Sequence, residues 1–320
     1  MKELLRNGLW GAIMALGELL PGVGMQTVAI IAGLYDDVIA FLFQGTEFVK
    51  TLGLFIIAKA KKEEVSAAFF NIPWKFGLSV FGILFLTIIA FSHAVGAVFE
   101  VYPTQIAALS FGIIMASILI PYKEITEKTW KEYLLFAVSF LCFFGLFSIQ
   151  GSGTSAPPSA LTFFGGGLVA SLAAFFPGIS ISLALLLMGL YEPLFASIEQ
   201  LTSRQADSYS FLTVLLFLVG LAIGMLLCVR ILNYVLQKYK SLFLAFIVGL
   251  ILASLRGVWP FIDQATQQAI LPWNVPVSQL TQQILLITVA FIVVTLIRKY
   301  AENKGTLASS FGQKERIVIT

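Results

Sequence analysis

The sequence has little charge: Asp, Glu, Lys and Arg together make up 12 % of its 320 residues, against about 25 % in a soluble domain. The longest uncharged stretches cover residues 76–99, 101–122, 133–191, 208–229 and 264–297. Such stretches are typical of helices that cross a bilayer, each of which needs about 20 apolar residues. With a mean hydropathy of +0.93, the chain is predicted to be an all-α polytopic membrane protein.

Histidine and cysteine are also scarce, with one histidine and two cysteines. Zinc sites, haem ligation and disulfide frameworks need more ligands than these, so we expect no metal and no cofactor. The net charge of +3 comes from basic residues at the predicted membrane edges. We therefore expect membrane lipids as partners and no nucleic acid.

An internal repeat organises the chain. Pro-Gly-Val at residues 21–23 recurs as Pro-Gly-Ile at 177–179, and Gly-Leu-Tyr-Asp at 33–36 recurs as Gly-Leu-Tyr-Glu at 189–192. The shift between the copies is 156 residues in both motifs. Each half is therefore predicted to contain one broken hydrophobic segment followed by about three spans, a plan found in many transporters.

A second match, at a shift of 137 residues, aligns Gly112 with Gly249 and Ser117 with Ser254. The first repeat, 1–150, is predicted to contain a hairpin at 7–43, an interfacial helix at 46–60 and spans at 76–99, 103–121 and 132–150. The second repeat, 151–298, is predicted to contain a hairpin at 161–200 and spans at 208–229, 241–258 and 282–297. Residues 299–320 would form a cytoplasmic tail.

Each hairpin carries a Pro-Gly break inside an apolar segment. Proline removes a backbone donor and clashes with the preceding turn, while glycine relaxes the chain. In hydrocarbon, such a break survives only where it is buried in protein or lines a wet cavity. A kinked transmembrane helix is the alternative, but two breaks at matching places favour re-entrant hairpins.

Basic residues predict the orientation. With both hairpins re-entrant, six spans and both termini in the cytoplasm, every Lys and Arg except Arg204 and Arg256 lies on the cytoplasmic side, as the positive-inside rule requires. Three spans separate the hairpins, so the hairpins enter from opposite faces and the two repeats have inverted topology. Such a repeat allows one central site to face either side in turn.

Glu18 is the strongest single candidate for a functional residue, because it is the only charged residue between Asn7 and Tyr35. A charge at mid-membrane costs about 2.5–3.5 kcal/mol on insertion scales, so it usually faces a partner or a cavity. Glu18 could carry a proton or act as a countercharge. Alternatively, it accepts hydrogen bonds from backbone donors freed at the break. The second repeat has Ala174 here, so the hairpins differ chemically.

The two breaks and the arms that follow them are predicted to form an anion site. Helix starts leave backbone amides unpaired and positive, and two such ends meeting at mid-membrane suit a phosphate or a carboxylate. The candidate residues are Pro21, Gly22, Gly24, Gln26, Thr27, Gly178, Ser180 and Ser182. Ordinary N-capping by Thr27 or Ser180 is the alternative interpretation.

Arg256 lies at the outer end of a predicted span, beside Trp259 and Pro260. A guanidinium there could hold a phosphate through two parallel hydrogen bonds. The alternative is an interfacial anchor whose charge reaches the headgroups.

Residues 18–27, followed by Gly-Leu-Tyr at 33–35, resemble the family pattern A-D-x-x-P-G-V-S-G-G-T with a later G-I/L-Y. Residues 177–182 and 189–192 resemble its second copy, P-G-I-S-G-S with G-L-Y-E, and residues 254–260 resemble its late S-L-R-x-x-W-P. On these motifs the chain resembles the bacterial polyprenyl-phosphate (undecaprenyl-phosphate) transporters of PopT type. Gly24, Met25, Gln26 and Ile181 depart from the pattern.

The resemblance implies transport of undecaprenyl phosphate, the lipid carrier of cell-wall synthesis, from the outer to the inner leaflet of the bacterial plasma membrane. The family's acid falls on Glu18, and its hydroxyl-rich turns fall on Thr27, Ser180 and Ser182. Arg256 would receive the phosphate from outside. Glu18, protonated when phosphate is present, would couple movement to a proton, with sodium as the other candidate ion.

Two other functional classes stay open at this point. A transporter of small anions would use the same architecture with a sealed polar pathway. An intramembrane lipid phosphatase would also bind phosphate, but such enzymes usually need histidine nucleophiles or metal ligands, and the chain has one histidine. We therefore expect a transporter and not an enzyme.

Overall fold

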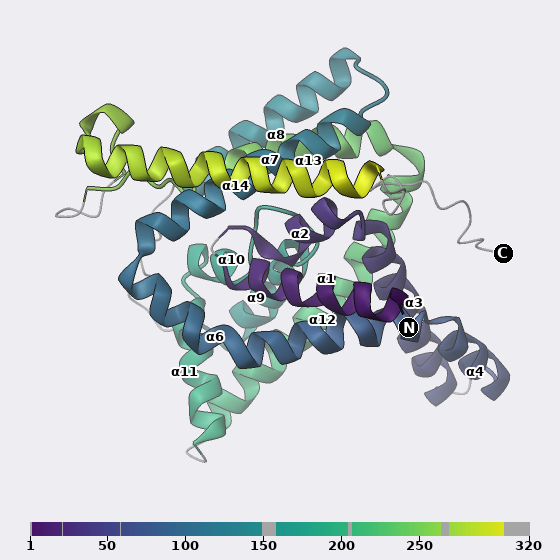
Figure 1. Ribbon diagram of the computed structural model, residues 1–320. Helices are drawn as coiled ribbons and strands as arrows, with labels where there is room; N and C mark the ends of the chain where they lie inside the picture. The colour runs from purple at the N-terminus through teal and green to yellow at the C-terminus, as the bar shows by residue number, and fades with distance from the viewer. Residues whose placement is uncertain are drawn as a thin grey trace.

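The computed structural model describes residues 2–20, 22–57, 59–148, 158–203, 207–263 and 269–303 (Figure 1). Within these ranges the chain is helical apart from turns and one isolated bridge between Ile262 and Ala269. The elements are α1 Lys2–Leu19, α2 Gly24–Ala32, α3 Tyr35–Ile56, α4 Lys62–Asn71, α5 Trp74–Gly77, the π-helical η1 Leu78–Gly82, α6 Ile83–Val101, α7 Pro103–Glu124, α8 Trp130–Ser148, α9 Ala160–Ala173, α10 Ile181–Leu187, α11 Tyr191–Thr202, α12 Ser208–Lys238, α13 Lys240–Ser254, the 3-10 turn η2 Pro272–Asn274 and α14 Val277–Asn303.

Six helical stretches in the described ranges are long and apolar enough to cross a membrane. Five of them overlap predicted spans: Trp74–Phe91, Pro103–Glu124, Trp130–Ser148, Ser208–Lys238 and Val277–Lys299. The sixth is α3, while α13, at the predicted span 241–258, is a shorter apolar helix of 15 residues. The prediction of a polytopic α-helical membrane protein is confirmed.

The structure differs from the sequence-based boundaries in α3, which runs unbroken where a hairpin ending at residue 43 and a separate helix at 46–60 were expected. The helix continues through this point, where the Thr46 hydroxyl donates back to the Phe43 carbonyl at 2.8 Å. Its charges are also paired. The Glu47 carboxylate lies 2.8 Å from the Arg230 guanidinium of α12 and 3.4 Å from the Lys50 ammonium.

The end of α14 also differs from the expectation. The helix continues to Asn303, so residues 299–303 of the predicted tail are helical, and residues 304–320 lie outside the described ranges. A helix end cannot be located from hydropathy alone, because the basic residues that follow Ile297 are good helix formers once they leave the apolar layer.

The repeat is visible in the backbone geometry. Gly22 and Gly178, which match at a shift of 156 residues, have φ of 73° and 85°. Gly33 and Gly189, the next matched pair, both have φ of 67°. These left-handed conformations are open to glycine at little cost. The two halves therefore turn at the same places, although Gly24 has φ of 69° where the matching Ser180 is extended.

The halves also pack reciprocally. Helix α1 packs on α6 and η1, as α9 packs on α12, while α7 of the first half packs on α14 and α8 on α13 of the second. Matched glycines permit these contacts. A Cβ on Gly112 would lie 2.4 Å from the Ile287 carbonyl oxygen, and one on Gly249 would lie 2.5 Å from that of Phe136.

We expect Gly112→Ala to lower the free energy of unfolding by about 1–3 kcal/mol, because the new methyl group meets the α14 backbone and the helices must separate. Gly145→Ala in α8 is the matched control, since a Cβ there meets nothing within 4 Å and alanine favours the helix by up to about 1 kcal/mol. Denaturation in detergent micelles measures both. Equal effects of the two substitutions would contradict the close α7–α14 contact.

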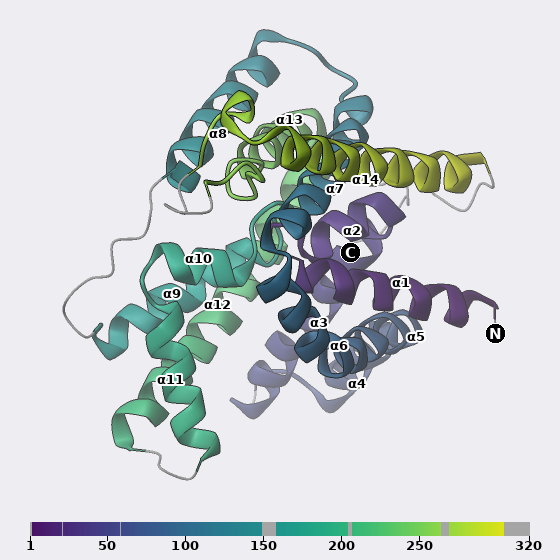
Figure 2. The same ribbon diagram turned by 60° about the vertical axis from the view of Figure 1, so that its left-hand side comes forward.

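Figure 1 shows α11 on one side of the helix bundle, with α3, α4 and the beginning of α1 on the opposite side. The last turns of α14 lie on the same side as the beginning of α1. Turned by 60°, the molecule shows the α1–α2 segment below α14 and the α9–α10 segment at a similar height below α8 (Figure 2). The two broken segments therefore lie at the same level of the fold.

Candidate functional site

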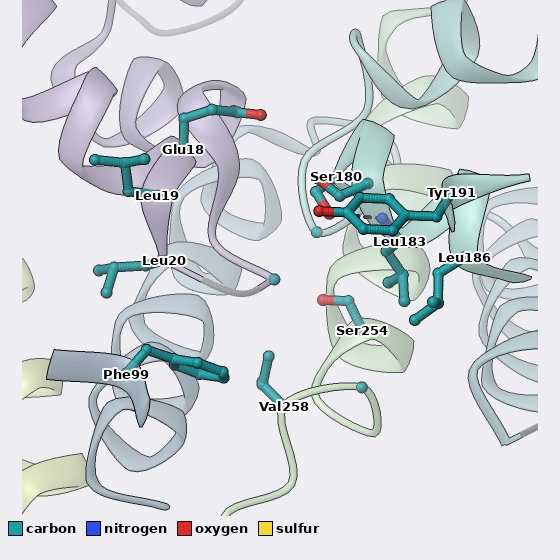
Figure 3. A pocket seen from close by; sticks show the side chains of 14 residues that line it. Glu18, Leu19, Leu20, Phe99, Ser180, Leu183, Leu186, Tyr191, Ser254 and Val258 are labelled. Carbon is teal, nitrogen blue, oxygen red and sulfur yellow. Dashed lines mark hydrogen bonds between the residues drawn. The ribbon is translucent and has the colours of Figure 1, made fainter. Parts of the chain in front are cut away.

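A cavity of about 380 Å³ opens between the two breaks (Figure 3). The first half contributes Glu18, Leu19, Leu20 and Gly22 from the end of α1 and Phe99 from α6. The second half contributes Gly178, Ser180, Ser182, Leu183, Leu186 and Tyr191 around α10, Ser254 at the end of α13, and Gly257 and Val258 after it. One carboxyl group and several hydroxyl groups therefore share the cavity with leucine and phenylalanine walls.

The turn that follows α13 lies between the two breaks. A Cβ on Gly178 would lie 2.6 Å from the Ser254 hydroxyl oxygen, and one on Gly22 would lie 2.4 Å from a Val258 methyl group. Glycine is therefore favoured at both positions for two reasons, the positive φ and the close approach of a neighbouring side chain. The turn fixes how far apart the two breaks lie.

Glu18 lines the cavity on the side opposite Ser180 and Tyr191 (Figure 3). Its Oε2 accepts a hydrogen bond of 2.8 Å from the Met25 amide, in the first turn of α2. The carboxyl group thus accepts a hydrogen bond from a backbone donor freed by the break, as the second interpretation of Glu18 predicts, and it also borders the cavity. Its role as a proton carrier or countercharge stays a prediction.

Hydroxyl groups line the opposite wall. Ser180 caps α10, where its Oγ accepts a hydrogen bond of 3.1 Å from the Leu183 amide. Ser182 is exposed in the first turn of α10, and the Ser254 hydroxyl donates to the Ile251 carbonyl at 2.8 Å. A serine oxygen has one O–H donor and two acceptor sites, so Ser180 can cap the helix and still donate to a ligand.

Three predicted residues of the first arm do not line the cavity. Gln26 points into the interface between the halves, where its Nε2 donates to the Ala174 carbonyl at 2.5 Å. Thr27 is 0 % exposed, and its hydroxyl oxygen has no hydrogen-bond partner among the described residues. Gly24 begins α2. The face of α2 that carries Gln26 and Thr27 is thus turned toward the protein core.

Arg256 lies in the turn between Ser254 and Gly257, which both line the cavity, but is not itself a lining residue. Pro21 lies outside the described residues. Sequence reasoning did not select Ser254 or Tyr191 as site residues, although both stand in the matched motifs. Phe99 and Val258 reach the cavity only through the packing of distant segments.

Metal ligands are not grouped in the described ranges, where no cluster of three or more His, Cys, Asp or Glu residues could hold a metal ion. The cavity instead offers hydrogen-bond donors beside apolar walls, in a protein built from membrane-crossing helices. This fold and this site define a polytopic membrane protein of the transporter class.

The sequence model of the undecaprenyl phosphate translocase-like family matches residues 14–271, and the chain belongs to this family, which comprises transporters and not enzymes. The match includes both breaks and every residue that lines the cavity. The chain is also similar to a polyprenyl-phosphate transporter of Vibrio cholerae serotype O1, with 26 % identity over 253 residues, 79 % of this chain and 77 % of that protein. No solved structure matches the chain.

Proposed function

We propose that the protein is a flippase for polyprenyl phosphate, which returns undecaprenyl phosphate from the outer to the inner leaflet of the bacterial plasma membrane for reuse in cell-envelope synthesis. The family membership and the name of the Vibrio cholerae relative support this substrate. The observation that carries the proposal is a cavity to which both breaks contribute, with hydrogen-bond donors and apolar walls together.

The chemistry of the cavity suits a phosphate on a long isoprenoid chain. The hydroxyl groups of Ser180, Ser182 and Tyr191 would donate to the phosphate oxygens, and the leucine side chains would contact the first isoprene units. Among its described lining residues there is no lysine or arginine. Neutral donors bind a phosphate less tightly than full charges do, which favours release after transport.

Alternating access would follow from the repeat. In this proposal the two repeats have inverted topology, both termini are cytoplasmic and each hairpin re-enters from its own face. The placement of α3 and α11 on opposite sides of the bundle supports this arrangement (Figure 1), because the two helices follow matched motifs. Arg256, beside the cavity, would receive the phosphate at the outer face.

Glu18 would couple transport to a proton. A carboxylate beside a phosphate in a medium of low dielectric constant is repelled strongly. The carboxyl group would therefore bind a proton when the phosphate enters and release it when the phosphate leaves. Sodium is the other ion that could fill this role.

Reconstitution in liposomes with labelled polyprenyl phosphate tests the function. We expect exchange of the lipid between leaflets, no release of inorganic phosphate and little competition from soluble phosphate. Ser182→Val should slow exchange about tenfold, as the loss of one hydrogen bond to a charged group predicts. Ser278→Val at the exposed start of α14 is the matched control. Release of inorganic phosphate, or equal rates for the two variants, would contradict the proposal.

A further inference from the structure

A second and larger cavity, of about 860 Å³, lies where α1 begins. It is bounded by the first turns of α1 and α3 and by the segment that joins α4 to α5. Its polar lining includes Arg6, Asn7, Asp37, Gln44 and Lys75. None of these residues lines the cavity between the breaks. On α1, Asn7 is about 16 Å from Glu18, at 1.5 Å per helical residue.

Asn7, which lines this cavity, has a buried amide oxygen without a hydrogen-bond partner among the described residues. The residue is 5 % exposed. A buried amide oxygen without a partner destabilises the folded protein. A ligand that donates a hydrogen bond would remove this cost.

The second repeat has an apolar residue at the same position. At the shift of 156 residues Asn7 corresponds to Phe163, which is 0 % exposed and packs in an apolar cluster with Leu190 and Leu194. Asp37 corresponds to Pro193. The fold is therefore compatible with an apolar core here, and the first repeat keeps a polar cavity that its packing does not require.

Gln44 gives an independent comparison. Its counterpart in the second repeat is Gln200, whose Oε1 accepts a hydrogen bond from the Ser210 hydroxyl. At this position both halves keep a glutamine, and in the second half its amide oxygen is bonded within the protein.

The lining charges carry both signs, with Arg6 and Lys75 cationic and Asp37 anionic. Lys75 stands in the first turn of the candidate span Trp74–Phe91, and Trp74, which also lines the cavity, is the residue type enriched at headgroup depth. Leu4 beside the cavity is 47 % exposed, and Phe70 is 78 % exposed. The cavity thus lies at a span end with apolar surface around it.

The geometry points to a binding site for the zwitterionic headgroup of an aminophospholipid such as phosphatidylethanolamine. Arg6 and Lys75 bind the phosphodiester oxygens. The ammonium group donates to the Asn7 amide oxygen and to the carboxylate of Asp37, which has several acceptor sites. A phosphate without an amine would leave the Asn7 amide oxygen unsatisfied. The site is separate from the transport cavity and does not depend on the proposed function.

Thermal unfolding of the purified full chain in detergent, with short-chain phosphatidylethanolamine added, tests the site. A lipid that binds only the folded protein raises the unfolding midpoint. We expect half of this rise at a lipid concentration at least about tenfold lower than for phosphatidylcholine, which has no N–H donor, or phosphatidylglycerol, which has no amine. A tenfold change corresponds to the loss of one hydrogen bond to a charged group.

Two variants complete the experiment. Asn7→Phe copies the second repeat and should remove the selectivity for phosphatidylethanolamine, while Arg6→Gln, at an exposed residue, should weaken binding at least about tenfold without disturbing the core. Lys62→Gln, on the exposed start of α4, is the charge-matched control. Equal responses to the three lipids in the unmodified chain, or an unchanged response in both Asn7→Phe and Arg6→Gln, would overturn the proposal.

Discussion

Glu18→Gln is expected to abolish the response of transport to a pH gradient. If one proton moves with each lipid, a gradient of one pH unit supplies about 1.4 kcal/mol, which is a tenfold ratio of lipid across the membrane. Glutamine cannot carry a proton, so the variant should reach a ratio near one. Proteoliposomes with an imposed pH gradient and labelled polyprenyl phosphate measure this ratio.

The substitution should leave the hairpin intact, because the glutamine oxygen can accept the hydrogen bond that the Met25 amide gives to Glu18 Oε2. Glu192→Gln is the matched control. It removes an exposed acid in the first turn of α11, and transport should stay coupled to the gradient. If Glu18→Gln still accumulated lipid tenfold for each pH unit, Glu18 would not be the coupling residue.

Gly178→Ala should lower the free energy of unfolding by about 2–5 kcal/mol and strongly reduce lipid exchange. At φ of 85° an alanine is strained by about 1–2 kcal/mol. Its Cβ would also lie 2.6 Å from the Ser254 hydroxyl oxygen, and overpacking costs about 1–3 kcal/mol. Denaturation in micelles and the exchange assay measure the two effects.

Two further variants separate these causes. Adding Ser254→Gly to Gly178→Ala removes the clash but not the strain at φ, so stability should recover only in part. Gly165→Ala in α9 is the control, since a Cβ there meets nothing within 4 Å. Full recovery in the double variant would show that backbone strain contributes nothing. Similar losses for Gly165→Ala and Gly178→Ala would contradict the close contact between the break and α13.

Much of the fold could be predicted because its signals are local. Hydropathy located five of the six candidate spans, and the repeated Pro-Gly and Gly-Leu-Tyr motifs located the turns that Gly22, Gly33, Gly178 and Gly189 make. The continuous α3 could not be predicted in this way. Its charged residues counted against a long apolar helix, and the pairing of Glu47 with Arg230 joins residues that are distant in sequence.

The cavity shows a similar division. The motifs marked Glu18, Gly22, Gly178, Ser180 and Ser182, and the structure places all five around one cavity. Neighbours in the same motifs behave differently, because successive residues of a helix point about 100° apart. Small rotations of α2 therefore decide whether Gln26 and Thr27 face a ligand or the core.

The sequence by itself determined the class of protein, the repeat and the position of both breaks, because sparse charge, proline and glycine act on the chain locally. Only the tertiary structure decided what the breaks meet. The end of α13 and the turn after it lie between them, so Ser254 and Val258 belong to the cavity. Gln26 instead joins the two halves through the Ala174 carbonyl. Such contacts depend on helix rotation and on close packing between residues far apart in the chain, which no local pattern encodes.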